Sequence, residues 1–430
     1  MYWANVGDGG YGHWSTNFGT PLRATGYGGG YGGINEIVNN GGFQWSGTDN
    51  SMAAYPNGAR FISSDPYGDY DSGNGGSTID TGTADLYISG YRGTFASGDN
   101  SIKVFGLAPA FPGEGHYVVG TYNANRVFNF RQFGPAWTYT GYLLPDALPT
   151  AKFGSSVAID GMTAIVGARD YDNRGAAFVF VRDGVEAETW SLQAKLQGLD
   201  TNKNDWFGSA VGVSGNTAIV GAAKANDDVS GAAYIFERIG DVWIQQAKLL
   251  ASDSAANRLF GLTAAISVDT AVVGAPNGNS AYIFYRTGFA WTQQQKYTGA
   301  SGFGSSLALN VDTLVVGSPN ENSNTGAAYV YTRANSTWTQ QAQLTASDGA
   351  SGDKFGTSVA VDGNRAAVGA PGDEGSTGAV YSFTRSATTW SSHQKLTLAS
   401  SAAGDNFGYS ISISGSRMVV GAYLRDVSRT

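Results

Sequence analysis

One stretch of the sequence recurs along most of the chain, and this repeat constrains the fold more than any other feature. Residues 153–168 read FGSSVAIDGMTAIVGA, and residues 207–222 and 355–370 repeat this pattern with few changes. Successive copies start about 50 residues apart, a period that indicates a solenoid, a propeller or an array of small units. Shorter or looser copies begin at Phe260, Phe303 and Phe407.

Each period contains four short apolar or aromatic runs. The copy that starts at Phe153 is followed by the run GAAFVF at residues 175–180, and then by a tryptophan with a polar tail. These runs are rich in Val, Ile, Phe and Tyr and are bounded by Gly, Asp, Asn or Ser, which is typical of strands. No segment shows an apolar stripe at helical spacing. The tryptophan recurs as Trp190, Trp243, Trp291, Trp338 and Trp390.

The turn residues predict how the first two strands pair. Asp160-Gly161 and Asp362-Gly363 each separate two apolar runs. Asp-Gly favours a two-residue type I′ turn, in which both central residues have positive φ, so these strands are expected to form antiparallel hairpins. Both faces of each hairpin are apolar, which indicates burial on both faces. Inner strands of a propeller blade, packed between neighbouring blades, fit this pattern.

The repeat resembles the FG-GAP family of β-propeller repeats, in its bacterial type rather than its integrin type. Gly274-Ala275-Pro276 and Gly369-Ala370-Pro371 carry the family signature, and the resemblance covers residues 105–422. It implies an all-β fold: a seven-bladed β-propeller of four-stranded antiparallel blades. The seven expected starts are Phe105-Gly106, Phe153-Gly154, Phe207-Gly208, Phe260-Gly261, Phe303-Gly304, Phe355-Gly356 and Phe407-Gly408.

Two regions follow from this interpretation. Residues 82–430 are expected to form the propeller, with residues 82–104 as closing strands, because the last copy stops near residue 422 after two strands. Strands from both ends of the chain would then complete one blade and leave no open edge. Residues 1–81 form a Gly/Tyr-rich segment, either a β extension or an irregular one, and we expect it to serve assembly or interaction.

Composition limits the partners. The net charge of −8 disfavours nucleic acid. The sequence contains no run of about 18 apolar residues, so no membrane span is expected. Residues 1–10 have neither the basic start nor the apolar core of a signal peptide. We nevertheless expect an extracellular or cell-surface location.

The sequence gives little support to a metal site. Integrin-type repeats place a calcium loop between strands one and two, whereas the turns here are too short to wrap a cation that takes six to eight oxygens. We therefore expect no cofactor; calcium is possible, but the turn sequences do not support it. A weaker candidate loop holds Asp200, Asn202 and Asn204, but Asp205 stands where such a loop needs glycine. A polar loop with Asx turns is the favoured interpretation.

No pattern of catalytic residues is apparent, so we expect no enzyme and no catalytic residue. The three histidines do not have zinc-ligand spacing. Ser155, Ser209 and Ser305 recur with the repeat and are therefore interpreted as structural. The tryptophans are interpreted as packing between blades rather than as sugar-stacking platforms. Asn335, in Asn-Ser-Thr, is a candidate glycosylation site.

These observations predict a non-enzymatic extracellular structural or adhesion protein. Its expected partners are other protein chains, foremost copies of itself, with surface glycans as a further class. Residues 1–80, rich in Tyr, Trp and Phe, are expected to dock on a neighbouring propeller and drive formation of a homo-oligomer or filament. Two alternatives remain open at this stage. One is a carbohydrate-binding propeller, and the other is a hydrolase with a site in the central channel.

Overall fold

A computed structural model describes residues 151–182, 189–226, 230–398 and 401–425 continuously, and shorter segments before them. Residues 126–133 and 136–145 are the longest of these segments. Within residues 1–81 only four strands are described, as two hairpins: β1 (Ala4–Asn5) with β2 (Tyr11–Gly12), and β3 (Gly33–Val38) with β4 (Gly42–Ser46). The remainder of residues 1–81, together with His13 and the Phe105-Gly106 start, lies outside the described residues.

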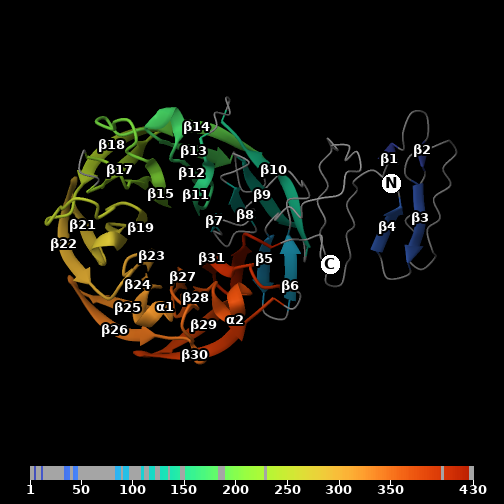
Figure 1. Ribbon diagram of the computed structural model, residues 1–430. Coiled ribbons are helices and arrows are strands. Elements are labelled where there is room, and N and C mark those ends of the chain that lie inside the picture. The colour runs from blue at the N-terminus through green and yellow to red at the C-terminus, as the bar shows by residue number, and fades with distance from the viewer. Residues whose placement is uncertain are drawn as a thin grey trace.

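Six four-stranded antiparallel sheets with the geometry of the repeat stand as blades around a central opening (Figure 1). The first strand of each blade lies innermost and the fourth lies at the rim. The first three blades are β11 (Phe153–Asp160), β12 (Thr163–Ala168), β13 (Ala176–Arg182) and β14 (Trp190–Leu196); β15 (Phe207–Ser214), β16 (Thr217–Ala222), β17 (Ala232–Ile239) and β18 (Val242–Leu249); and β19 (Thr263–Ser267), β20 (Thr270–Ala275), β21 (Ser280–Thr287) and β22 (Ala290–Thr298).

The next two blades follow the same order, with a short helical turn between their second and third strands. They are β23 (Ser306–Asn310), β24 (Thr313–Ser318), α1 (Glu321–Asn324), β25 (Ala327–Ala334) and β26 (Thr337–Leu344); and β27 (Ser358–Asp362), β28 (Arg365–Ala370), α2 (Asp373–Ser376), β29 (Ala379–Ser386) and β30 (Thr389–Leu396). The first and third blades have 3₁₀ turns at that place, η1 (Tyr171–Asn173) and η2 (Pro276–Gly278).

The sixth blade combines strands from the two ends of the chain. Its strand order is β31 (Phe407–Ser414), β32 (Arg417–Ala422), β5 (Thr83–Ile88) and β6 (Tyr91–Phe95). Strand β32 pairs with β5 in antiparallel register, with Arg417 opposite Ile88 and Ala422 opposite Thr83. This blade therefore holds the two ends of the propeller together through backbone hydrogen bonds.

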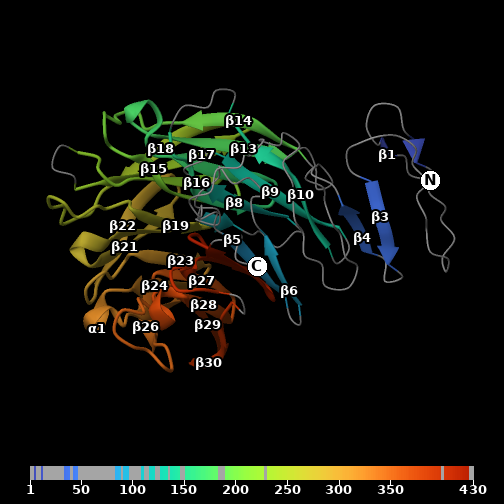
Figure 2. The ribbon, with the colours of Figure 1, turned by 45° about the vertical axis from the view of Figure 1, so that its right-hand side comes forward.

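A further four-stranded sheet departs from the repeat. It contains β7 (Ala108–Ala110), β8 (His116–Thr121), β9 (Arg126–Phe133) and β10 (Ala136–Leu143), and it lies between the first and sixth blades in both views (Figures 1 and 2). Strand β7 has only three residues, and five residues separate it from β8, whereas two residues join the first two strands of each of the six blades. The predicted count of seven FG-GAP blades is therefore wrong: six blades have the geometry of the repeat.

The hairpins inside the blades also correct one detail of the prediction. Asp160 pairs with Thr163, so the two loop residues are Gly161 and Met162 rather than Asp160 and Gly161. Only the first of these, Gly161, has positive φ (54°). This pattern matches a type II′ turn, not the predicted type I′ turn.

The core lies between the blades, around the second and third strands. All six residues of β12, β16, β20 and β24 are buried. In the first five blades, the Phe of the Phe-Gly start packs against aromatic rings of the third strand of its own blade. In the second blade, the Phe207 ring centroid lies 5.4 Å from that of Tyr234 and 6.1 Å from that of Phe236. The alternating aromatic residues of the third strand therefore fix the start of the first strand.

Candidate functional site

The antiparallel blades give the ring two chemically different faces. The hairpins that join strands one to two and strands three to four lie on one face, which we call the hairpin face. The connections from strand two to three, and from strand four to the next blade, lie on the opposite face, which we call the loop face. The candidate site residues divide between these faces and the central channel.

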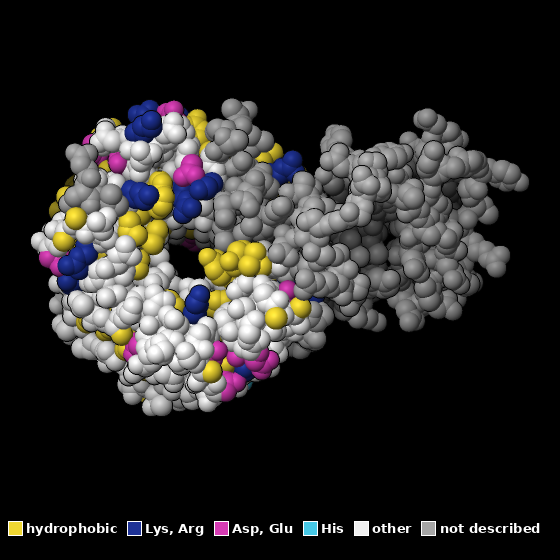
Figure 3. Space-filling model, viewed as in Figure 1, with side chains coloured by type: hydrophobic (Ala, Val, Ile, Leu, Met, Phe, Trp, Pro, Cys, Tyr) yellow, Lys and Arg dark blue, Asp and Glu magenta, His cyan; other side chains and the backbone are white. Residues whose placement is uncertain are grey.

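The central channel is apolar. It has a cavity of about 260 Å³ lined by three residues from the first strand of each of the six blades. Figure 3 shows hydrophobic side chains around the opening, with Lys and Arg side chains nearby. None of the described lining residues is charged, so this lining offers no pair of carboxylates for glycoside hydrolysis. The middle lining residue of each blade is small: Ala158, Gly212, Ala265, Ala308, Ala360 and Ser412.

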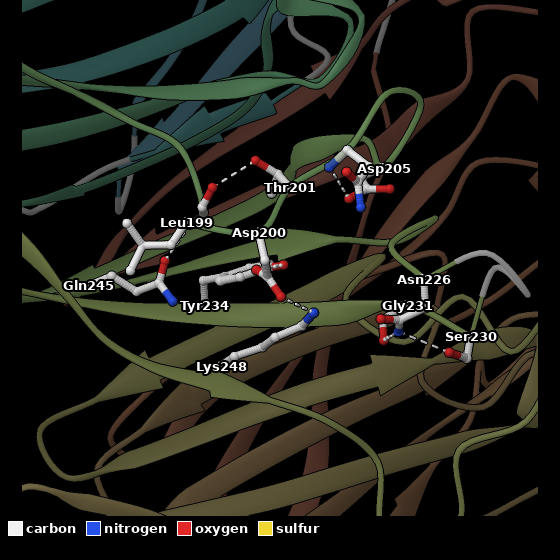
Figure 4. Close-up of polar contacts among 12 residues, drawn as sticks. Leu199, Asp200, Thr201, Asp205, Asn226, Ser230, Gly231, Tyr234, Gln245 and Lys248 are labelled. Atoms are coloured by element: carbon white, nitrogen blue, oxygen red, sulfur yellow. Dashed lines mark hydrogen bonds and ion pairs between the residues drawn. The ribbon is translucent and has the colours of Figure 1, made fainter.

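The candidate metal loop on the loop face is held by a lysine and a tyrosine (Figure 4). Asp200 Oδ2 accepts a hydrogen bond from Lys248 Nζ at 2.7 Å, and Oδ1 accepts one from the Tyr234 hydroxyl at 2.9 Å. The backbone N–H of Asn202 donates to Asp205 Oδ2 at 2.6 Å. Asn204, with φ of 70°, donates its backbone N–H to the Asn173 carbonyl at 2.6 Å. Both oxygens of Asp200 therefore serve to tie this loop to strands β17 and β18.

The same arrangement recurs in other blades. Asp253 accepts hydrogen bonds from the Tyr282 hydroxyl at 2.8 Å and from Lys296 at 2.7 Å. The third example consists of Asp348, Tyr381 and Lys395, with distances of 2.6 and 2.7 Å. We call these three groups the Asp–Tyr–Lys triads. The sequence pattern did not predict these groups, although the Tyr of GAAYIF and the Lys near the end of strand four both recur with the repeat. Among the described residues, no cluster of three or more His, Asp or Glu side chains could hold a metal ion.

The triads shift the pKa values of their members. Burial raises the pKa of Asp200, but the hydrogen bonds from Lys248 and Tyr234 outweigh it, so that the pKa falls below 3.8. In the second triad the hydrogen bond from Lys296 is the main cause of the lowered pKa of Asp253. Burial and the hydrogen bond to Asp253 raise the pKa of Tyr282 to about 12. The triads are therefore charged Asp⁻ and Lys⁺ groups around a neutral tyrosine at neutral pH.

The turn aspartates on the hairpin face join neighbouring blades. Asp160 Oδ2 accepts the backbone N–H of Gly215 at 2.6 Å, and Asp362 Oδ2 accepts that of Gly415 at 2.6 Å. In each case the acceptor ends the first strand of one blade, and the donor is the first turn residue of the next blade. The recurring Asp at this position is therefore used to hold the turn of the adjacent blade.

The recurring tryptophans lie between blades. Strand four of each of the first five blades contains a β-bulge, and the bulged residue is Gln193 in the first blade and Gln246 in the second. The indole N–H of Trp243 donates to Gln193 Oε1, and that of Trp291 donates to Gln246 Oε1, each at 2.8 Å. The bulge thus directs an amide toward the tryptophan of the following blade, as bulges commonly redirect side chains.

A recurring arginine completes this contact. Arg333 Nε donates to Asp312 Oδ1 at 2.7 Å within its own blade, and Nη1 donates to Thr270 Oγ1 of the preceding blade at 2.8 Å. Its guanidinium also lies 5.5 Å from the ring centroid of Trp338. Corresponding contacts are made by Arg238, Arg286 and Arg385. The role of these arginines, which follow the aromatic run of strand three, was not predicted from the sequence.

The remaining candidate residues lie at separate positions in the propeller. Asn335 is exposed at the tip of the β25–β26 hairpin, with φ of 57°. Ser209 Oγ donates to the Gly261 carbonyl of the next blade at 3.1 Å. His116 is buried, with Nε2 at 2.7 Å from Arg182 Nη1, whereas His393 is exposed on β30. The structure brings none of these residues together in a common site.

Comparison with known proteins places this geometry among characterised families. The model of the FG-GAP repeat matches six segments: residues 140–180, 190–236, 243–284, 291–331, 338–383 and 390–429. Each matched segment contains the first strands of one of the six blades; the first segment begins within β10, and β7, β8 and β9 lie outside all six. This comparison also corrects the expected count from seven repeats to six.

Two solved structures that resemble the chain are distant from it in sequence. A chain of the "Crystal Structure of Mitotic Checkpoint Complex" is 11% identical, with a TM-score of 0.49, over 82% of this chain and 98% of that one. Sqt1 of Saccharomyces cerevisiae is 10% identical, with a TM-score of 0.43, over 75% of this chain and 96% of that one. No curated protein matches the chain.

Proposed function

Because the chain belongs to the FG-GAP repeat family, we propose that it is a non-enzymatic extracellular protein that binds other protein chains, copies of itself among them. Propellers of this family are typical of extracellular or surface proteins and commonly mediate protein contacts. In the described part of the chain, no helix is long and apolar enough to cross a membrane.

The observation that carries this proposal is a set of exposed apolar side chains on the hairpin face. Phe289, at the tip of the β21–β22 hairpin, is 88% exposed. In the neighbouring blade, Ile239 and Val242 flank the β17–β18 turn and are 66% and 61% exposed. Val268 and Val311, at turns beside the channel, are 58% and 50% exposed. Large apolar side chains gathered on one face of a propeller are typical of a protein-binding surface.

The described residues give less support to the two alternatives. Sugar stacking needs an accessible aromatic face, but Trp338 is 1% and Trp243 is 9% exposed, and an arginine covers each ring. Hydrolysis needs acid and base groups, whereas the described channel lining has none. Protein binding requires neither an exposed indole ring nor acid and base groups in the channel.

Residues 1–81 supply a second element of the proposal. Their glycines and aromatic side chains suit a segment that becomes ordered against a partner, and aromatic residues are enriched at interfaces. We assign self-association to this segment, which docks on the propeller of a neighbouring copy.

The test compares the full chain with the variant Phe289→Ser/Ile239→Ser and with a chain that lacks residues 1–80. Light scattering and electron microscopy should show assemblies of the full chain and smaller particles for the deletion. Capture of partner chains from extracellular fluid should be lost in the double variant, while Asn335→Gln serves as a control on the same face. Monomeric full-length protein at high concentration, together with unchanged capture by the double variant, would contradict the proposal.

A further inference from the structure

Two cations on the loop face lie against one and the same aromatic ring. The protein is acidic, and among the described residues Lys152, Lys248, Arg286 and Lys395 each lie within 3.0 Å of a carboxylate oxygen. Arg169 and Lys224 have no such carboxylate in the described part of the chain. Instead, both lie against the ring of Trp206. Lys224 Nζ is 3.6 Å and the Arg169 guanidinium carbon is 4.9 Å from the centroid of that ring.

The backbone places these three residues together from two adjacent blades. Arg169 follows β12 of the first blade, whereas Trp206 precedes β15 and Lys224 follows β16 of the second blade. Trp206 has φ of 59°, and the neighbouring N–H of Lys224 donates to the Asp205 carbonyl at 3.0 Å. Since β15 is a channel-lining strand, the group stands beside the channel on the loop face. We call Arg169, Trp206 and Lys224 the cationic cluster.

The nearest carboxylates along the chain are already bonded elsewhere. Asp170 pairs with Lys152 at 2.8 Å, and Asp205 is buried and accepts the N–H of Asn202. Arg169 Nε is buried without an acceptor among the described residues. Two cations held by one indole ring attract an anion strongly, because the ring keeps both charges in place and partly desolvated.

We propose that the cationic cluster binds an acidic peptide segment, and that the segment is residues 65–71 of a second copy of this chain. That stretch reads DPYGDYD, with three carboxylates in seven residues and no Lys or Arg between residues 61 and 91. Closely spaced carboxylates match the two cations, and the tyrosines add apolar surface for the channel mouth. The inference rests on the proposed self-association through residues 1–81 and names the contact that forms it.

The first experiment measures binding of a fluorescent peptide of residues 61–73 to the full chain by anisotropy. The variant Arg169→Gln/Lys224→Gln should bind about tenfold more weakly, since two charge-assisted hydrogen bonds are lost. Trp206→Leu keeps both charges but removes the ring that positions them, so it should also weaken binding. Lys203→Gln, an exposed lysine in the same connection, should leave binding unchanged. A peptide with Asp65, Asp69 and Asp71 changed to Asn should not bind.

Equal binding by the Arg169→Gln/Lys224→Gln and Lys203→Gln variants would overturn the assignment, as would binding of the Asn peptide. Tighter binding of polygalacturonate than of the Asp peptide would show that the cluster recognises acidic sugars instead, which also overturns it. Far-ultraviolet circular dichroism and melting temperature confirm that each variant is folded.

A second experiment distinguishes failure of the proposed binding site from failure of the proposed function. The full chain with Asp65→Asn/Asp69→Asn/Asp71→Asn should self-associate less in sedimentation than the original chain. If the original chain associates and neither this variant nor the cluster variant changes the association, the inference fails while the proposed function stands. If the chain is monomeric and the triple variant binds the free peptide more tightly, residues 65–71 occupy the cluster within one copy, which overturns the second-copy assignment.

Discussion

Gly369 of strand β28 lies directly against the backbone carbonyl of Gly408 in strand β31 of the next blade. A Cβ atom on Gly369 would collide with that carbonyl oxygen. The same contact joins Gly167 to Gly208 and Gly317 to Gly356. The two glycines that define the repeat, one in each half of the motif, therefore meet each other across every such blade interface.

Gly369→Ala should destabilise the propeller by about 2–3 kcal/mol, because the added methyl forces two backbones apart in a close-packed region. Equilibrium unfolding in urea gives the difference. Gly288→Asn is the matched control: its surroundings are open within 4 Å, and asparagine tolerates its positive φ of 62°. Equal losses of unfolding free energy from both substitutions would show that the close contact of Gly369 with Gly408 does not determine the stability of the interface between the blades.

Arg333→Lys should cost about 1–2 kcal/mol, because lysine cannot bridge Asp312 and Thr270 while lying over Trp338. A double-mutant cycle with Thr270→Val should give a coupling energy of about 1 kcal/mol across the two blades. Arg174→Lys is the control, since Arg174 pairs with Asp172 only at the exposed surface. Additive effects of the two substitutions would show that Arg333 and Thr270 do not stabilise the contact between the two blades.

Acid should weaken the Asp–Tyr–Lys triads. The pKa of Asp253 in the folded protein is depressed below 3.8, so its stabilising effect is present above pH 3.8 and is lost as the pH falls through the lower folded value. Asp253→Asn should therefore lower the free energy of unfolding at pH 7, and the difference should shrink below pH 3.8. Urea titrations between pH 2 and 7 measure this. A difference that stays constant over that range would exclude the charged triad.

Val268 and Val311 occupy turn positions that favour glycine. Their φ values are 53° and 49°, in the region that a β-branched side chain rarely adopts. Val268→Gly should stabilise the protein by about 0.5–1 kcal/mol, because relief of strain exceeds the added entropy of glycine. Val242→Gly, at an equally exposed position without positive φ, should destabilise it. Melting temperatures would decide, and a loss of stability in both variants would contradict this account.

The blade architecture could be predicted from the sequence because each repeat is specified by residues that lie close together in the chain. Phe355 and Gly356 recur with a short apolar run, and Gly363 marks the turn that joins two strands. Such features depend on neighbouring residues, so they can be recognised without coordinates. The Phe105-Gly106 pair was counted as a seventh start because it has the same local sequence. The two-residue turn that should follow is missing, since five residues separate β7 from β8.

Other features depended on residues that lie far apart in the sequence. The Gln341 amide meets the Trp390 indole 49 positions later, and Asp200 finds Lys248 48 positions away. The sequence therefore showed Asp200 as a polar loop residue but not as the partner of a lysine. Likewise, Arg169 and Trp206 belong to different blades, and only the packing of these adjacent blades brings them into contact.

The sequence by itself determined the repeat, its strands, the buried character of the second strand and the glycines that allow close approach. The tertiary structure decided the number of FG-GAP blades, the contacts between blades and the distribution of charge on the two faces. The physical reason is that strand formation and turns follow from local side-chain size and backbone freedom. Contacts between blades instead follow from the packing of whole sheets around the ring, which no single repeat specifies.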